Sequence, residues 1–231
     1  MSDQPRSPSG TVIALIPAFN EAARVAAVVT KTRPHVSEVV VVDDGSADKT
    51  AEVARCAGAT VLRHEQNRGK GAAIITALNY FASSDAEFGV FLDADGQHDP
   101  DEVPKFVEAA RCEGAAIVVG TRMSETRDMP LVRRWTNQFT SWITSKMARH
   151  EIADSQCGYR LVRRDVVKDL KLMTARFETE TEMLIQAGRA GHKIVSVPVR
   201  TIYGGEARAS HIHHWRDTVR FFKLVGRYWT A

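Results

Sequence analysis

The chain has 231 residues, a hydrophobic content of 44% and a formal net charge of +3. That length and apolar content are sufficient for one globular domain with a full core. The mild charge comes without a long run of Lys or Arg, so we expect no nucleic-acid partner. The three cysteines are widely spaced and fit neither a disulfide framework nor a zinc motif, which indicates a reducing cytoplasm. No apolar run approaches the roughly 20 residues that a membrane-spanning helix needs.

The chain begins with a polar segment, residues 1–10, that contains two prolines and no apolar core. A signal peptide needs such an apolar core, so we interpret this segment as a disordered leader. The folded domain is then expected over residues 11–210. An amphipathic C-terminal helix is expected over residues 211–231.

Apolar runs of strand type alternate with helical patterns through the first half of the chain. Strands are predicted at residues 11–17, 38–42, 59–62, 88–92 and 116–120, with helices between them. These strands lack a polar face, which is typical of a mainly parallel sheet that helices cover on both sides. The predicted fold class is therefore α/β, with ligands bound beyond the carboxyl ends of the strands.

Polar residues after the first two strands predict how the following helices and turns are stabilised. Asn20 is the expected N-cap of the first helix. Asp48 or Ser46 is expected to cap the second helix. Asp43 is interpreted as a residue that stabilises the turn, not as a ligand of a bound molecule.

After residue 122 the alternation loosens into longer helices. Helices are predicted at residues 130–149, 178–190 and 215–229, and a last strand at 193–201. The first of these helices has an unusually aromatic stripe, which we interpret as core; a lipid-facing helix is the alternative. The stripe consists of Leu131, Trp135, Phe139, Trp142, Ile143 and Met147.

The terminal helix has an apolar face and a basic face. This composition is typical of a helix that is attracted to anionic lipid. Docking of the helix on the domain, or in a dimer interface, is the alternative interpretation. The apolar face contains Trp215, Val219, Phe222, Val225 or Gly226, and Trp229, and the basic face contains Arg216, Arg220, Lys223 and Arg227.

Two carboxylates follow the fourth predicted strand with a single residue between them. Asp93 and Asp95 come directly after that strand, and Gly96 lets the chain turn away. Two anions this close are costly unless a cation neutralises them, and paired carboxylate oxygens suit Mg²⁺ or Mn²⁺. Because these ions share coordination positions with substrate phosphates, the turn predicts an open site for a nucleoside diphosphate.

Four motifs, taken together, identify a family resemblance. They are Ile-Pro-Ala-Phe-Asn-Glu at residues 16–21, Val-Val-Asp-Asp-Gly-Ser-Ala-Asp at 41–48, Asn-Arg-Gly-Lys-Gly at 67–71 and Asp-Ala-Asp-Gly-Gln-His at 93–98. In this order and at these intervals the chain resembles the inverting family 2 glycosyltransferases of the GT-A fold. Within them it is most similar to the branch of dolichyl-phosphate mannosyltransferase and its polyprenyl-phosphate relatives. The resemblance covers residues 11–210.

The resemblance implies a GT-A fold with a metal-dependent site for a sugar donor. Asp93 and Asp95 are expected to hold Mg²⁺ or Mn²⁺, with Gln97 as a further ligand and with Asp95 as a catalytic residue. Lys70 lies at a helix N-terminus between two glycines, which looks like an anion cradle. The residues expected to bind the nucleotide sugar are Pro17, Phe19, Glu21, Val42, Asp44, Lys70, Asp93, Ala94 and Asp95.

The resemblance also implies the reaction. One sugar passes from a nucleoside diphosphate sugar, GDP-mannose or a UDP-hexose, to a polyprenyl phosphate of the dolichyl or undecaprenyl type, with inversion at the anomeric carbon. Arg122, after the fifth strand, is expected to hold phosphate as a catalytic residue. Arg133 and Arg134 are expected, also as catalytic residues, to hold the acceptor phosphate together with Ser155. A lipid phosphate is already an anion near neutral pH, so this reaction needs no general base.

Two other functions are compatible with the same residues. A sugar hydroxyl as acceptor, as in polysaccharide or glycolipid synthesis, needs a base, and Asp154 is the candidate by resemblance. A non-catalytic nucleotide-sugar binding protein is the other hypothesis, which the intact pair of Asp93 and Asp95 disfavours. His98 is interpreted as a solvated turn residue, and Cys157 as a small buried residue and not a nucleophile.

A lipid acceptor sets the expected location of the chain. We expect a cytoplasmic protein that is peripheral at the cytoplasmic face of the membrane, with the membrane surface, and also a membrane protein, as expected partners. In the family an Arg and a Lys after the last strand contact the donor phosphates. Residues 201–210 match neither of them, and Arg200 or Arg208 is the candidate replacement.

Overall fold

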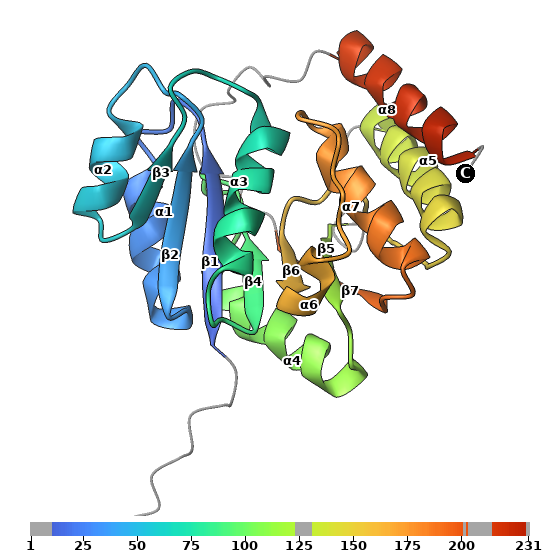
Figure 1. Ribbon diagram of the computed structural model, residues 1–231, viewed down its shortest axis with the longest axis horizontal. Coiled ribbons are helices and arrows are strands. Elements are labelled where there is room, and N and C mark those ends of the chain that lie inside the picture. The colour runs from blue at the N-terminus through green and yellow to red at the C-terminus, as the bar shows by residue number, and fades with distance from the viewer. Residues whose placement is uncertain (1–10, 123–130, 201, 203–213, 230–231) are drawn as a thin grey trace, which may run out of the picture.

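The computed structural model describes residues 11–122, 131–200, 202 and 214–229, apart from the side chains of residues 131–133 and 214–217. The leader expected at residues 1–10 lies outside the described residues. The side chain of Arg133 and the segment that contains Arg208 also lie outside them. In the described part, helices surround a central sheet (Figure 1).

The sheet has seven strands in the order β3-β2-β1-β4-β6-β5-β7. Neighbouring strands are parallel except around β6, which runs antiparallel to both β4 and β5. The predicted α/β fold with a mainly parallel sheet is thus confirmed. The strands are β1 (Val12–Ala18), β2 (Glu38–Asp43), β3 (Thr60–Arg63), β4 (Phe88–Phe91), β5 (Ile117–Thr121), β6 (Arg160–Arg163) and β7 (Ile194–Pro198).

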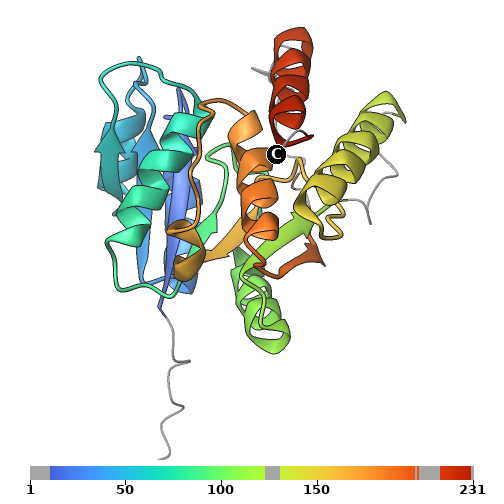
Figure 2. The same ribbon diagram turned by 45° about the vertical axis from the view of Figure 1, so that its right-hand side comes forward.

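Helices cover both faces of this sheet (Figures 1 and 2). On one face α3 packs against α6 and α7, and on the other α1 packs against α2 and the short 3-10 turn η2. The helices are α1 (Val25–Thr32), α2 (Thr50–Cys56), α3 (Lys70–Ala82), α4 (Val103–Glu113), α5 (Leu131–Ala148), α6 (Arg164–Val167), α7 (Glu178–Arg189) and α8 (His214–Trp229), with the 3-10 turns η1 (Arg33–His35) and η2 (Pro100–Glu102).

The central strands are buried because their side chains are apolar on both faces of the sheet. Residues 40–42 of β2 and 117–119 of β5 have no exposed surface. Each such Val or Ile contributes about 1.5–3 kcal/mol through burial. This uninterrupted apolar pattern predicted the parallel sheet. The buried strands hold the loops at their ends in place.

The helix after β1 begins later than predicted, and its predicted cap has another role. α1 starts at Val25, and Asn20 has a left-handed backbone with a φ of 55°. The side chain of Asn20 accepts a hydrogen bond from Ala47 N–H at 2.9 Å, and its own N–H donates to Ser46 Oγ at 2.9 Å. The N-cap prediction for Asn20 is wrong because the residue joins the loops that follow β1 and β2.

The loop after β2 contains the other predicted caps. Asp48 Oδ1 accepts a hydrogen bond from the N–H of Thr50, the first residue of α2, at 3.0 Å. Asp43 Oδ1 accepts from Ser46 N–H at 3.0 Å, and Asp43 Oδ2 lies 3.2 Å from Arg63 Nε. Asp48, and not Ser46, therefore supports the start of α2. The predicted turn-stabilising role of Asp43 is confirmed.

The aromatic stripe of α5 faces solvent. Trp135 is 71% exposed, Phe139 50% and Trp142 59%, whereas Ile143 is buried. The prediction that the stripe forms core is therefore wrong for its three aromatic residues. The helix instead buries a face of mostly small and polar side chains, which include Asn137, Ser141, Thr144 and Ala148.

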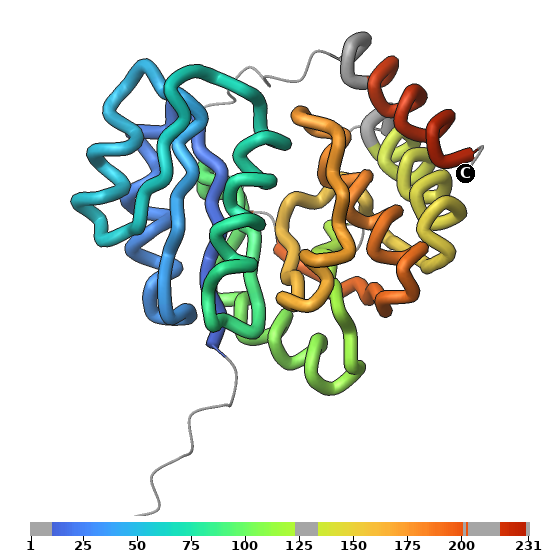
Figure 3. The backbone as a smooth tube through the Cα atoms, in the orientation of Figure 1, coloured from blue at the N-terminus to red at the C-terminus, as the bar shows by residue number. Residues whose placement is uncertain are grey.

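α8 packs beside α5 (Figure 3). It also has exposed apolar side chains. Phe221 and Val225 are buried against Ile143 of α5, so the docking interpretation holds for one face of the helix. Phe222 and Trp229, on the apolar face predicted from the sequence, are 49% and 72% exposed. Among the described residues, no helix combines the length and apolarity needed to cross a membrane.

Candidate active site

Several loops that contain charged residues follow the carboxyl ends of the strands, at the upper edge of the sheet in Figure 1. Asp93 and Asp95 follow β4, and Arg122 follows β5. β1, β2, β4 and β5 all run in one direction, so the loops that follow them share this edge. This is where open α/β sheets bind ligands.

The turn after β4 has the donor chemistry of a site for a hard divalent cation. It presents the carboxylates of Asp93 and Asp95 and the amide oxygen of Gln97, the kinds of ligand that Mg²⁺ and Mn²⁺ prefer. Asp95 Oδ1 accepts a hydrogen bond from Gln97 N–H at 3.0 Å, and Gly96 permits the turn with a φ of 77°. The residues thus fit the predicted cation, which would take its remaining ligands from substrate phosphates or water.

His98 lies under this turn and is not solvated. Only 7% of the surface of this residue is exposed, and its ring stacks on Tyr159 with 4.9 Å between centroids. Its Nδ1 accepts a hydrogen bond from the N–H of Asp93 at 3.1 Å. Burial lowers the pKa of His98, which favours the neutral ring. The solvated interpretation is wrong, and the residue supports the backbone of the turn.

Lys70 lies between two carboxylates that come from different elements. Its Nζ is 2.7 Å from Asp93 Oδ1 and 3.5 Å from Glu180 Oε1, in the first turn of α7. Burial opposes the charge of Lys70, but the two carboxylates outweigh it and raise the pKa of the ammonium. At Asp93, burial is likewise outweighed by Lys70, which holds the pKa of that carboxyl well below its usual range. Both groups are therefore charged near neutral pH.

The backbone at the start of α3 already binds an anion, the carboxylate of Asp44. The N–H groups of Arg68 and Gly69 donate to Asp44 Oδ1 and Oδ2 at 2.9 and 2.7 Å. His64 Nδ1 lies 2.7 Å from Asp44 Oδ1. These two donors are therefore occupied from within the chain. Contact of Lys70 with a bound nucleotide sugar stays a prediction.

The other residues expected at the nucleotide lie at or near the carboxyl ends of three neighbouring strands, β2, β1 and β4. Pro17 is the next-to-last residue of β1, Phe19 begins the loop that follows the strand, and both are partly exposed. The N–H of Glu21 donates to Thr50 Oγ1 at 2.8 Å, which ties this loop to the start of α2. Val42 and Ala94 are buried. The structure brings these residues to one edge, and their contact with a nucleotide stays a prediction.

Arg122 is fixed in position by a buried carboxylate. Its Nε and Nη2 donate to Asp154 Oδ2 and Oδ1 at 2.9 and 3.2 Å, a bidentate pair. Asp154 has no exposed surface and also accepts from Gln156 N–H at 3.1 Å. Burial opposes charge on Arg122, yet the hydrogen bond to Asp154 raises its pKa, so the guanidinium stays charged. It lies near enough to Asp93 to help lower the pKa of that carboxyl.

The predicted acceptor residues lie around α5. Ser155 is buried, and its N–H donates to Ser141 Oγ at 2.9 Å, which joins the loop before β6 to this helix. Arg134 is exposed in the first turn of α5. The side chain of Arg133 lies outside the described residues. The roles of these three residues at an acceptor phosphate stay predictions.

Comparisons with known proteins decide the family. A model of glycosyl transferase family 2 matches residues 13–171. The chain belongs to glycosyl transferase family 2. This confirms the resemblance found in the four motifs, and the enzyme class is that of a glycosyltransferase.

Two curated relatives of this glycosyltransferase have names that describe lipid-phosphate acceptors. The UDP-N-acetylglucosamine–dolichyl-phosphate N-acetylglucosaminyltransferase of Methanococcus voltae is 32% identical over 212 residues, which cover 82% of this chain and 84% of the relative. The undecaprenyl-phosphate mannosyltransferase of Micrococcus luteus is 29% identical over 201 residues, which cover 81% and 82% of the two chains.

The solved structures confirm the GT-A fold of the glycosyltransferase. Glucosyl-3-phosphoglycerate synthase from Mycobacterium tuberculosis, in complex with Mn²⁺ and UDP-glucose, superimposes with a TM-score of 0.69 at 21% sequence identity. The match covers 94% of this chain and 80% of the other. At that level of identity the likeness shows the fold alone.

Two residues that sequence analysis missed organise the site of the glycosyltransferase. Glu180 is the second partner of Lys70. Arg160 is 1% exposed and donates to three carbonyl oxygens, those of Ser155, Cys157 and Glu180, at 2.6–2.7 Å. It thus holds the loop before β6 against α7. A charged residue at the start of an apolar strand was the signal in the sequence.

Cys157, in the same loop, is buried, as predicted. Burial raises the pKa of its thiol to about 12. Since the thiolate is the nucleophilic form, this residue is inert near neutral pH. The prediction that Cys157 is not a nucleophile agrees with its surroundings.

Gly158 is required for the approach of this loop to the acid turn. A Cβ at this position would lie 2.9 Å from Asp93 Oδ2 and 3.2 Å from Lys70 Nζ. We expect Gly158→Ala to displace Lys70 or Asp93 and to lower kcat/KM about tenfold or more, since small displacements of a reactive site are costly. Steady-state kinetics would measure this. A kcat/KM of Gly158→Ala equal to that of the wild type would contradict the expectation.

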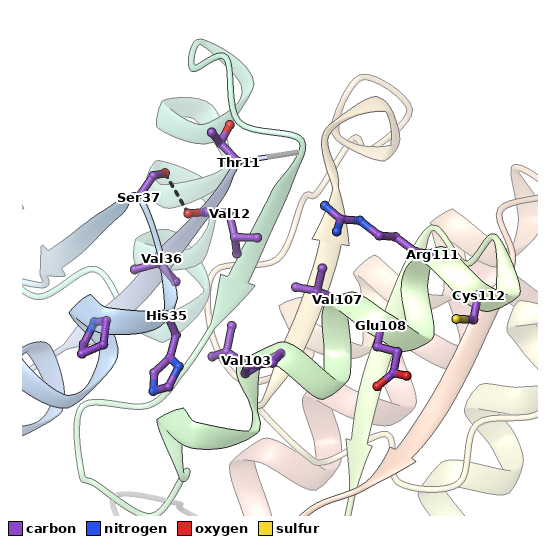
Figure 4. A pocket seen from close by; sticks show the side chains of 12 residues that line it. Thr11, Val12, His35, Val36, Ser37, Val103, Val107, Glu108, Arg111 and Cys112 are labelled. Atoms are coloured by element: carbon purple, nitrogen blue, oxygen red, sulfur yellow. Dashed lines mark hydrogen bonds between the residues drawn. The ribbon is translucent and has the colours of Figure 1, made fainter. Parts of the chain in front are cut away.

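A separate hollow lies at the opposite edge of the sheet, near the start of β1 (Figure 4). Its lining includes Val12, His35, Val103 and Arg111, and Ser37 Oγ donates to Val12 O at 2.9 Å beside it. The amino ends of parallel strands are not the usual place for ligands of an α/β sheet. The candidate active site is therefore the edge that contains the acid turn.

Proposed function

We propose that this glycosyltransferase transfers one sugar from a nucleoside diphosphate sugar to a polyprenyl phosphate, with inversion at the anomeric carbon. The observation that carries the proposal is that the acid turn at Asp93 and Asp95 shares one edge of the sheet with the fixed guanidinium of Arg122. The names of the relatives from Methanococcus voltae and Micrococcus luteus support a lipid phosphate as acceptor. Donors of the GDP-mannose or UDP-hexose class fit a diphosphate site.

On the donor side, Asp93, Asp95 and Gln97 would hold Mg²⁺ or Mn²⁺. The bound ion supplies Lewis-acid stabilisation of the diphosphate leaving group. Arg122 donates N–H groups to a phosphate oxygen as negative charge develops there. Because Asp154 already fixes the guanidinium, little reorganisation is needed during the reaction.

On the acceptor side, the reaction needs cations and orientation. Arg133 and Arg134 would attract the lipid phosphate. Ser155, which is 1% exposed, would hold the adjacent loop in place through its contacts with Ser141. The phosphate oxygen attacks the anomeric carbon from the side opposite the diphosphate, which inverts that centre. An acceptor that is already an anion has no proton to lose, so the site needs no general base.

The structure favours this reaction over transfer to a sugar hydroxyl. In the hydroxyl reaction, Asp154 would have to accept a proton from the acceptor. Its two oxygens instead accept hydrogen bonds from Arg122 and Gln156, and it has no exposed surface. A carboxylate with these partners is a positioning residue for Arg122.

A matrix of donors tests the donor side of the proposal. GDP-mannose, UDP-glucose and UDP-N-acetylglucosamine, each with a labelled sugar, are incubated with a polyprenyl phosphate and with Mg²⁺, Mn²⁺ or EDTA. We expect label from one donor to pass into the organic phase with either metal and not with EDTA. Nucleotide release without label in the lipid would contradict the proposed acceptor. Equal transfer in EDTA would contradict the proposed metal.

We also propose that the enzyme works at the cytoplasmic face of a membrane, through the outer faces of α5 and α8. Of the seven large apolar side chains that are exposed in the described residues, five lie on these two helices. Arg134 and Lys146 of α5, and Lys223 and Arg227 of α8, are exposed on the same helices. Exposed aromatic side chains beside basic ones are typical of a surface that binds anionic lipid. The five are Trp135, Phe139, Trp142, Phe222 and Trp229.

Removal of two of these aromatic side chains is expected to weaken membrane binding. We expect the double variant Trp142→Ser, Trp229→Ser to bind vesicles that contain phosphatidylglycerol at least about tenfold more weakly, because each indole loses its burial at the interface. Co-sedimentation with the vesicles measures the binding. Met173→Ser is the matched control, because Met173 is 72% exposed but lies on neither helix. Equal sedimentation of the double variant and the control would contradict the membrane role and favour recruitment by a membrane protein.

A further inference from the structure

Lys70 is held at the acid turn by the surrounding backbone as well as by its charge. It is the first residue of α3, directly after Gly69, whose φ is 101°. Gly158 closes the other side, where even a Cβ would crowd Lys70 and Asp93. The ammonium therefore has two carboxylate partners within reach, Asp93 at 2.7 Å and Glu180 at 3.5 Å.

This pairing affects any divalent cation that binds at the turn. Asp93 Oδ1 is already in contact with the ammonium of Lys70. A metal ion and an ammonium cannot both take the same carboxylate at close range without strong repulsion. This repulsion favours movement of Lys70 away from Asp93 when an ion binds there, and the ammonium, which is mostly buried, then needs another anion.

Glu180 is placed to be that anion. Its side chain is 13% exposed, and its carboxylate is already 3.5 Å from Lys70 Nζ. Its backbone oxygen accepts a hydrogen bond from Arg160 Nη1 at 2.6 Å, which fixes this turn of α7 beside the site. Lys70 Nζ therefore has a second carboxylate within reach if its contact with Asp93 is lost.

We infer that Lys70 is a built-in counter-cation of the acid turn, which a divalent metal displaces from Asp93 onto Glu180. Glu180 is then a positioning residue that keeps the ammonium inside the site. The inference rests on the metal role proposed above for Asp93. It has a consequence for the order of binding, because the metal alone must compete with Lys70, whereas a metal that arrives with a diphosphate brings further oxygen ligands. The enzyme therefore binds the metal weakly until the donor is present.

Direct measurement of Mn²⁺ binding, without donor or acceptor, tests the inference. Free Mn²⁺ is followed by electron paramagnetic resonance in titrations of the full chain. We expect Lys70→Met to bind Mn²⁺ at least about tenfold more tightly than the wild type, because the competitor is lost and two carboxylates remain. The matched control is Lys31→Met, which removes the same charge from the exposed last turn of α1. We expect its affinity to stay within about twofold of the wild type.

A second variant keeps the test decisive if Lys70→Met does not fold. Glu180→Gln retains Lys70 at Asp93 but removes the carboxylate that receives it, so we expect Mn²⁺ binding at least about threefold weaker than in the wild type. Glu52→Gln, on the exposed side of α2, is its control. The inference would be overturned if Lys70→Met bound Mn²⁺ no more tightly than the wild type does, or if Glu180→Gln bound Mn²⁺ with unchanged affinity. Since neither titration uses donor or lipid, failure of the proposed transfer reaction is a separate result.

Discussion

Replacement of Asp95 by Asn is expected to lower kcat about 10²–10³-fold, the usual cost of removing one group that stabilises charge in a transition state. The change is isosteric, and the side-chain oxygen of Asn can still accept the hydrogen bond from Gln97 N–H that Asp95 accepts at 3.0 Å. The turn should therefore keep its shape and lose one negative charge at the metal. Steady-state kinetics with increasing Mn²⁺ measures the effect, and a higher metal concentration should restore part of the rate.

Asp101→Asn is the matched control for this variant. Asp101 follows the same turn by a few residues, and its carboxylate is 82% exposed and pairs with His35 at 2.9 Å. We expect its kcat to be within about twofold of the wild type, because exposed pairs of this kind contribute little. A rate for Asp95→Asn above one third of that of the control would contradict a metal site at the turn.

Asp154→Asn is expected to reduce both stability and activity, because the variant breaks a buried ion pair. Removing one partner of such a pair costs about 3–5 kcal/mol in the free energy of unfolding. Arg122 would lose its bidentate acceptor and its fixed orientation, so we expect kcat/KM to fall about 10–100-fold. Urea denaturation and steady-state kinetics measure the two effects. The control is Asp169→Asn, at a half-exposed carboxylate 2.8 Å from His192, with an expected change below about 1 kcal/mol.

A double-mutant cycle separates a positioning role of Asp154 from a role as general base. If Asp154 acts through Arg122, then Arg122→Met should have a similar effect, and the double variant should be little worse than either single variant. A general base would act independently of Arg122, so the losses would multiply. If folded Asp154→Asn kept less than about one thousandth of the wild-type rate, this would also favour general-base chemistry and a hydroxyl acceptor.

Most strands of the sheet could be predicted because each strand is marked by a run of apolar residues within its own stretch of sequence. Residues 40–42 and 117–119 are uninterrupted apolar stretches, and burial on both faces of a parallel sheet requires such stretches. The polar motifs at the strand ends, which include Asp93 and Asp95, were also visible as sequence. Parallel strands bring the loops that follow them to one edge, so fold and motif together predicted where the site lies.

The pairing of charges within the site was not predictable, because it depends on contacts between distant segments. Arg122 and Asp154 are 32 residues apart, and nothing near either residue marks the other as its partner. Lys70 resembled part of an anion cradle at a helix start, yet Asp44 already accepts from the N–H groups of Arg68 and Gly69, and Asp93 and Glu180 hold the ammonium.

The predictions for the outward face of α5 and for the exposure of His98 were wrong for a related reason. The aromatic stripe of α5 has the spacing of a core face, but α5 buries its small residues and α8 packs beside it, so the aromatics face outward. His98 lies in a polar turn, and its ring is buried and stacks on Tyr159, which lies far along the chain. Periodicity indicates that a helix has two faces and does not show which one the rest of the chain covers.

The most direct test of sugar transfer to a lipid phosphate compares a polyprenyl phosphate with the corresponding polyprenol as acceptors. The two lipids have the same chain and differ only in the phosphate, so membrane or micelle partitioning is matched. With the active donor and Mn²⁺, we predict that labelled sugar enters the lipid only when the phosphate is present, and that the anomeric configuration of the product is inverted. Equal transfer to the polyprenol, or transfer only to a soluble glycan, would contradict the proposed function.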